Sequence, residues 1–220
     1  MTDMSITLDL RGEVERIRHG AGHALSSHAF ASLFLWRRQM GLSLLALDGA
    51  YSARCLREDA LFFPCGSPDA ARAFVEGLSP GDRLVYLRGR DAAYLEKAFA
   101  GRFRLRRRHD ADEYLYAIRD HLALSGGAFA NLHTQVHRVE HAFDVRTEPL
   151  GPDNLSDALR VIRGWRHGER RFGGIGLRDD EVDAEALALL GPLGMEGVLT
   201  RLGRPARGRD GRLSPYGRHL

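Results

Sequence analysis

The sequence predicts an α/β (α+β) protein built on a mixed sheet with flanking helices. Three observations favour this class: apolar runs of strand length, amphipathic segments of helix length between them, and turn residues where the two meet. The 220 residues are enough for one large domain or two small ones. An apolar share of 44% is ordinary for a globular protein.

Residues 1–120 are expected to form a first unit that opens with two helices. Residues 9–19 carry apolar side chains at helical spacing. A second helix is expected from residue 29, with Ser26 or Ser27 as its N-cap and Gly41 at its end.

Strands and helices then alternate to the end of this unit. Asp48-Gly49 lies between two apolar runs, which is a strong hairpin signal. Ser67 is expected to cap a helix with Pro68 at its first position. The expected strands are 42–48, 51–57, 60–66, 83–89 and 103–109, and the expected helices are 67–78 and 91–101.

The two cysteines are too few for a disulfide scaffold. Cys55 and Cys65 lie on the two arms of an expected hairpin that turns near residues 57–60, in a register that keeps them apart. Buried free thiols are therefore expected.

The stretch 103–143 joins this unit to a second one. Residues 112–116 are acidic and aromatic and suit a second strand or a sharp bend, and Ser125-Gly126-Gly127 breaks the chain. A long helix follows. Its apolar positions recur at steps of four, three and four, which predicts a buried stripe. The stripe is Leu132, Val136, Val139 and Phe143.

Residues 121–200 are expected to be the opening part of a second copy of the first unit. The elements expected after the long helix are a strand at 144–151, helices at 157–168 and 183–190, and a strand at 195–202. Residues 201–220 hold six arginines and one acid, which favours a disordered Arg/Gly-rich tail or an unfinished second copy. This tail carries a charge of +5 and the remainder −2, so the overall +3 is weak evidence for a nucleic-acid partner.

No targeting or membrane signal is evident. The N-terminus has early acidic residues and no apolar core, so a signal peptide is not expected. No run approaches the roughly 18 apolar residues of an integral membrane segment. A cytoplasmic location is the resulting expectation.

Three motifs give the chain a resemblance to a known family. They are Asp112, Tyr114, Leu115, Tyr116, Leu124, Ser125 and Gly126; then Ser26, Phe30, Leu33, Phe34, Trp36 and Arg37; and Phe63, Pro64 and Gly66. Over residues 20–200 the chain resembles the phosphatidylglycerol lysyltransferase C-terminal-domain-like family. This resemblance implies a tandem GNAT fold and kinship with enzymes that move an aminoacyl group from charged tRNA to an amine or hydroxyl.

The resemblance implies candidate catalytic residues in the acidic and aromatic run. Asp112 or Glu113 could act as general base, and Tyr114 and Tyr116 could line a cleft. The alternatives favoured by the residues alone are carboxylates that cap or that pair with the arginines of 106–108, and tyrosines packed in a core.

Candidate donor-binding residues lie at two helix starts. Arg88 and Arg90 flank Gly89 before a helix, where an anion could bind. Ser125 and Gly126 belong to the first of the three family motifs. The family helix opens with Lys/Arg and Asn, whereas this chain has residues 131–134 as Asn-Leu-His-Thr and keeps Arg138 as the fixed cation of that turn.

The expected function is transfer of an activated aminoacyl or acyl group to an amine or hydroxyl, from aminoacyl-tRNA or acyl-CoA and without a further cofactor. The alternative is a non-catalytic binding or scaffold protein of the same fold. The sequence leaves the acceptor and the oligomeric state open.

Two other patterns are weaker. His133, His137 and His141 form a column on one helix and could share a metal, but a solvated flank is favoured and no metal site is predicted. Residues 173–176 are glycine-rich but match no phosphate-binding motif, so a loop is favoured.

Overall fold

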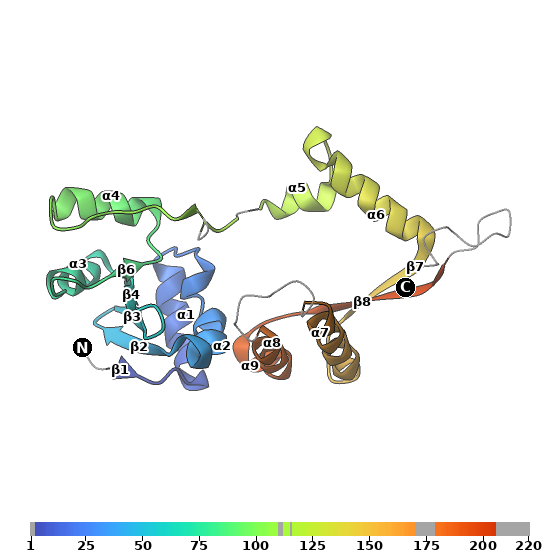
Figure 1. Cartoon of the computed structure of the whole chain (residues 1–220), viewed down its shortest axis with the longest axis horizontal. Coiled ribbons are helices and arrows are strands. Elements are labelled where there is room, and N and C mark those ends of the chain that lie inside the picture. The colour runs from blue at the N-terminus through green and yellow to red at the C-terminus, as the bar shows by residue number, and fades with distance from the viewer. Residues whose placement is uncertain (1–2, 110–111, 115, 170–178, 206–220) are drawn as a thin grey trace. The chain divides into compact units, whose positions relative to one another are not determined.

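The computed structural model describes residues 3–109, 112–114, 116–169 and 179–205 (Figure 1). The chain divides into two compact units: Met1–Glu113 with Leu159–Met195, and Tyr114–Ala158 with Glu196–Leu220. The expected boundary at residue 120 follows chain order, whereas the structure groups Leu159–Met195 with the first unit.

The first unit is a mixed sheet flanked by helices, as the sequence predicts. The sheet runs β1-β2-β3-β4-β6, with β5 also paired to β3, and only the β4–β6 pair is parallel. The elements are β1 (Asp3–Met4), η1 (Leu8–Leu10), α1 (Arg11–Gly20), η2 (Ser26–His28), α2 (Phe30–Met40), β2 (Leu42–Leu47), β3 (Ala50–Cys55), β4 (Ala60–Phe62), β5 (Cys65–Gly66), α3 (Pro68–Glu76), β6 (Leu84–Val85), α4 (Gly89–Ala98), α8 (Asp179–Ala188) and α9 (Leu190–Leu193).

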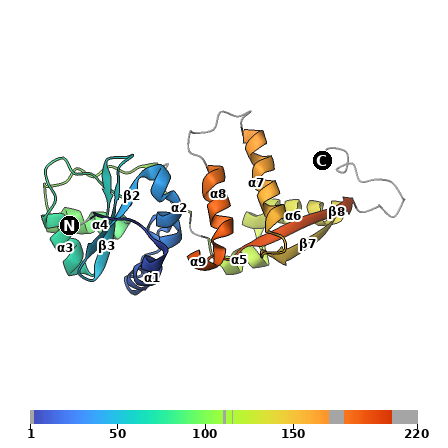
Figure 2. The same cartoon turned by 90° about the horizontal axis from the view of Figure 1, so that it is seen from below.

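Helices cover both faces of this sheet. In two perpendicular views α1 and α2 lie on one side of the sheet and α3 and α4 on the other (Figures 1 and 2). Consecutive strand residues point to opposite faces, so Leu44 packs with α1 and α2 while Leu45 packs with Phe74 of α3 and Leu95 of α4. Both cysteines are buried and free, which confirms the expected thiols.

α2 begins differently from the prediction. Neither Ser26 nor Ser27 caps it; the N-cap residue is Ala29, and the Phe30 N–H donates to the Glu15 carboxylate at 2.7 Å. Burial alone would raise the pKa of Glu15, but the Arg18 guanidinium and the Phe30 N–H outweigh burial and lower it. α1 therefore supplies the missing acceptor for the first turn of α2.

The strand expected at 103–109 is wrong, and of the two alternatives for 112–116 the strand is absent at the described residues 112–114 and 116. The described residues between Phe103 and Tyr116 belong to no strand. Phe103 packs edge-on against Phe99, and the arginines that follow are exposed. Alternating arginines carry no apolar face to bury against the sheet, so alternation alone does not make a strand here.

The second unit is built on a two-stranded antiparallel sheet. β7 pairs with β8 from Phe143↔Pro205 to Pro149↔Val198, so residues 201–205 of the expected tail are strand. Residues 206–220 and the glycine-rich loop at 173–176 lie outside the described residues. The elements are α5 (Ile118–Ala123), η4 (Gly127–Phe129), α6 (Ala130–Ala142), β7 (Phe143–Pro149), the start of α7 (Leu155–Glu169), and β8 (Val198–Pro205).

The apolar stripe on α6 is not buried, contrary to the prediction. Leu132, Val136 and Val139 are 40%, 38% and 41% exposed. A two-stranded sheet offers little surface to cover a helix. The amphipathic pattern therefore predicted the helix correctly but not the burial of its apolar side chains. Within the described residues, no helix is both long and apolar enough to span a bilayer.

Two imidazoles are buried between α1 and the sheet. His23 and His28 have ring centroids 4.0 Å apart and are 3% and 0% exposed. Burial lowers the pKa of His23 from 6.5 to about 3 and that of His28 to about 4. Both rings are therefore neutral at pH 7.

The start of α4 depends on a buried ion pair. Asp91 accepts from the Arg88 backbone N–H at 2.9 Å and from its guanidinium at 2.7 and 2.8 Å. The side chains are only 18% and 7% exposed. Asp91 thus caps the helix and neutralises Arg88 at once.

Stability should fall as the pH drops from 7.5 to 5.5. Both folded-state pKa values lie below 6.5, so the unfolded chain binds more protons in the window from about 6.5 down to 4. We expect a loss of about 1 kcal/mol per imidazole in urea unfolding. His23→Leu should flatten the dependence, while His109→Ala, at an exposed site, should not. An unchanged slope in His23→Leu would contradict this account.

Asp91→Ala should destabilise the first unit by about 3 kcal/mol, because it leaves the buried Arg88 guanidinium without its partner. Thermal or urea unfolding measures the change. Glu76→Ala removes the exposed Arg72–Glu76 pair of α3 and serves as the matched control, with little expected effect. Equal effects of the two substitutions would show that the Arg88–Asp91 pair has no special structural role.

Candidate functional site

A β-bulge interrupts the strand that runs from β4 to β5. β4 pairs Arg54 with Leu61, and continuing that register would place Pro64 opposite Tyr51. Tyr51 instead pairs with Cys65. One extra residue therefore lies on this strand, and a bulge is where a strand tolerates proline.

Side chains from neighbouring elements hold the carbonyls of the bulge. The Ser52 hydroxyl donates to the Phe62 carbonyl at 2.7 Å. His28 Nε2 lies 2.7 Å from the Phe63 carbonyl, so this nitrogen carries the proton and donates. The Tyr51 hydroxyl donates to the His28 carbonyl at 2.6 Å. Two buried hydrogen bonds thus hold the bulge, and the third holds the backbone of His28.

The chain then enters α3 through a position that only glycine fits. Gly66 has φ +146°, and an added Cβ would lie 2.4 Å from the Ala50 Cβ. Ser67 follows and caps α3 by accepting from the Ala70 N–H at 3.2 Å, as the sequence predicts. The N-terminus of α3 is therefore directed by the bulge.

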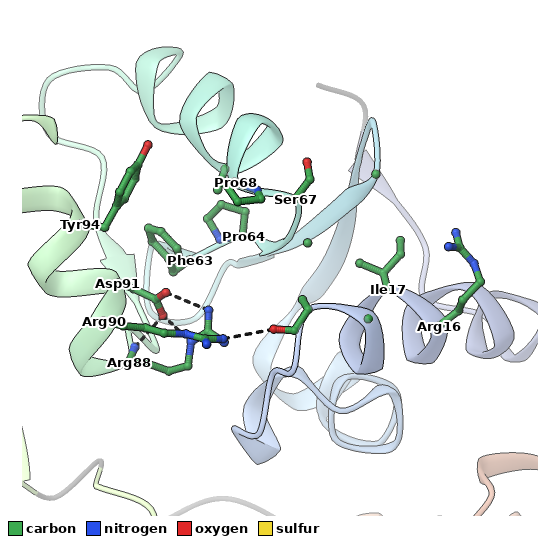
Figure 3. A pocket seen from close by; sticks show the side chains of 15 residues that line it. Arg16, Ile17, Phe63, Pro64, Ser67, Pro68, Arg88, Arg90, Asp91 and Tyr94 are labelled. Atoms are coloured by element: carbon green, nitrogen blue, oxygen red, sulfur yellow. Dashed lines mark hydrogen bonds and ion pairs between the residues drawn. The ribbon is translucent and has the colours of Figure 1, made fainter.

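A pocket of about 590 Å³ lies beside the bulge. Phe63, Pro64, Ser67 and Pro68 line it between two groups of helical side chains (Figure 3). On one side are Arg16 and Ile17 of α1, and on the other Arg88, Arg90, Asp91 and Tyr94 at the start of α4 (Figure 3).

The electrostatics of this pocket favour an anion. The N-terminal ends of α3 and α4 both reach its lining, and each end carries a partial positive charge. Three arginines line it, and Asp91 is the single carboxylate among its lining residues. Because Asp91 is paired with Arg88, the net charge of the lining is positive.

The pocket contains little that could move a proton. The Asp91 carboxylate already accepts from the Arg88 backbone N–H and forms an ion pair with the Arg88 guanidinium. The nearby Cys65 thiol is no nucleophile, because burial raises its pKa even though the Tyr51 hydroxyl acts to lower it. The lining residues are therefore suited to binding a charged group more than to acid–base chemistry.

Of the sequence candidates, Arg88 and Arg90 lie together at this pocket. Arg88 is committed to Asp91, whereas the exposed Arg90 reaches the Ala21 carbonyl at 3.2 Å. Asp112 forms an exposed ion pair with Arg107 at 2.9 Å, as its pairing alternative predicted, and Arg107 lowers the pKa of Asp112. Glu113 accepts from the Ser26 N–H at 2.8 Å.

The remaining candidates belong to the second unit. Tyr114 and Tyr116 are 85% and 61% exposed and stack with ring centroids 6.1 Å apart, so the favoured core packing is wrong. Ser125 and Gly126 are exposed ahead of η4, and Arg138 is exposed on α6. None of these five residues lines the pocket.

Sequence reasoning missed several residues of the pocket. Arg16, Ser67 and Tyr94 line it, and His28 supports its back wall. The one signal that could have located it is the proline at position 64 inside an apolar strand run, because an interior strand tolerates proline only at a bulge.

No curated protein matches the chain. A crystal structure of a conserved protein of unknown function from Bacteroides thetaiotaomicron is similar, with a TM-score of 0.83 and 18% identity. The match covers 93% of this chain and 73% of that chain, and at this identity it supports the fold alone.

The family comparison covers most of the chain. The family described as phosphatidylglycerol lysyltransferase, C-terminal, matches residues 19–212. This span includes the bulge, both helix starts at the pocket and most of the second unit. The chain therefore belongs to the phosphatidylglycerol lysyltransferase C-terminal family and carries a lysyltransferase-like domain.

Proposed function

We propose that this protein takes part in aminoacyl transfer and that the pocket of its first unit receives the anionic part of an activated donor, aminoacyl-tRNA. The observation that carries the proposal is the convergence of two helix starts and three arginines on one pocket. Family membership supplies the reaction class. The acceptor would be an amine or a hydroxyl.

The pocket architecture supports a GNAT-like reading of the first unit. The parallel β4–β6 pair separates beside a bulge, and a helix follows each strand with its N-terminus at the opening. This arrangement presents backbone N–H groups and arginines to a phosphate without any metal ion. An acyl-CoA donor carries phosphates too, so it is the competing donor.

A second candidate function is binding without catalysis. Asp112 and Glu113 already have partners, and Asp91 is the one carboxylate of the lining. Direct attack by an amine needs its proton removed, and the one carboxylate of the lining is bound to Arg88. These observations favour a domain that holds a donor and does not transfer the acyl group.

Arg90→Ala should weaken donor binding without unfolding the unit, because Arg90 is exposed and Arg88 retains Asp91. We expect a loss of roughly tenfold, or about 1.4 kcal/mol, in fluorescence titration with Lys-tRNA. Arg72→Ala, which removes an exposed arginine of α3 that does not line the pocket, is the control and should bind like the parent.

Titration with Lys-tRNA, uncharged tRNA and acyl-CoA separates the donors, and labelled lysine transferred to phosphatidylglycerol or a free amine reports catalysis. Donor binding with transfer supports the enzyme. Donor binding without transfer supports the second candidate. Absence of binding to all three ligands at micromolar concentrations would contradict the role proposed for the pocket.

A further inference from the structure

Three histidines on α6 form an exposed column. His133, His137 and His141 follow one another at intervals of four residues, so their side chains lie on one helical face. The ring centroids of the first pair are 4.8 Å apart and those of the second pair 5.4 Å. His137 belongs to both pairs.

These spacings match a metal chelate. A zinc ion lies about 2.0–2.1 Å from each imidazole nitrogen, and tetrahedral angles then put the centres of two ligating rings about 5 Å apart. Both pairs are close to this value before any adjustment of rotamers. The exposed rings also need no desolvation of a protein core to reach an ion.

One chain supplies too few ligands for a closed site. Among the described residues, no group of three or more His, Cys, Asp or Glu is arranged to hold a metal. A tetrahedral zinc site takes four ligands, and a pair on α6 provides two. A second α6 would provide the other two, so the site becomes complete only between two copies.

The apolar stripe of α6 lies on a different side of the helix from the histidines. Leu132, Val136 and Val139 are about 40% exposed, but at 3.6 residues per turn their mean direction is roughly 130° from that of the column. The ligand count, and not the stripe, therefore points to the occupant, which is the same helix face of a second copy of the chain.

We propose that α6 is a metal-dependent pairing helix, in which a His pair from each of two chains binds one Zn²⁺ ion. This proposal does not depend on the function of the pocket in the first unit. Its ligand is Zn²⁺ or a divalent ion of similar preference for imidazole.

The test measures zinc stoichiometry by calorimetry and molar mass by light scattering, with and without Zn²⁺. The parent should bind one ion per two chains and double its mass, and EDTA should reverse both. Binding without a change of mass would overturn the pairing, and absence of binding would overturn the site.

Four variants distinguish the column from other imidazoles. His137→Ala removes both pairs and should weaken zinc binding at least roughly tenfold. His133→Ala and His141→Ala each leave one pair and should still bind and pair, whereas His109→Ala should behave like the parent. Loss of binding in His109→Ala, or unchanged binding in His137→Ala, would overturn the assignment, and circular dichroism checks that each variant keeps its helices.

Discussion

The bulge at Phe62–Cys65 is the constraint on which the rest of the site depends. It shifts the pairing of this strand with β3 by one residue, close to the point where the parallel pairing of β4 with β6 stops. The bulge also sets the direction in which α3 leaves the sheet. The bulge displaces backbone carbonyls from the strand pairing. The Ser52 and His28 side chains donate hydrogen bonds to two of these carbonyls.

The charges around the pocket follow from the same geometry. Two helix starts that face one opening create a positive region whatever side chains stand there. Asp91 cancels Arg88 and in doing so makes the start of α4 rigid, so the charge available to a ligand comes from Arg16, Arg90 and the backbone. This division explains why the pocket is well suited to hold an anion while its single carboxylate is unavailable for chemistry.

Local signals predicted the elements well, because each acts within a few residues. Asp48-Gly49 gave the hairpin, Ser67 and Pro68 the start of α3, and Gly41 the end of α2. The pocket could not be predicted in the same way. The bulge beside it depends on the pairing of two strands, and its lining comes from segments as distant in sequence as Arg16 and Tyr94. The expected helix start pointed to Arg88 and Arg90 as candidates. The sequence could not show that Asp91 forms an ion pair with Arg88.

The two units show why an amphipathic pattern predicts a helix better than it predicts burial. α1 and α2 bury their apolar faces because a broad sheet lies beneath them, whereas the second unit offers a pair of strands. Among its described residues only Ala142, Ala158 and Leu199 are buried apolar side chains. Strand pairing and the exposed ion pairs of Arg201 with Glu148 and Asp157 add little in water. The α6 stripe is therefore apolar area that the strand pair of this unit leaves exposed.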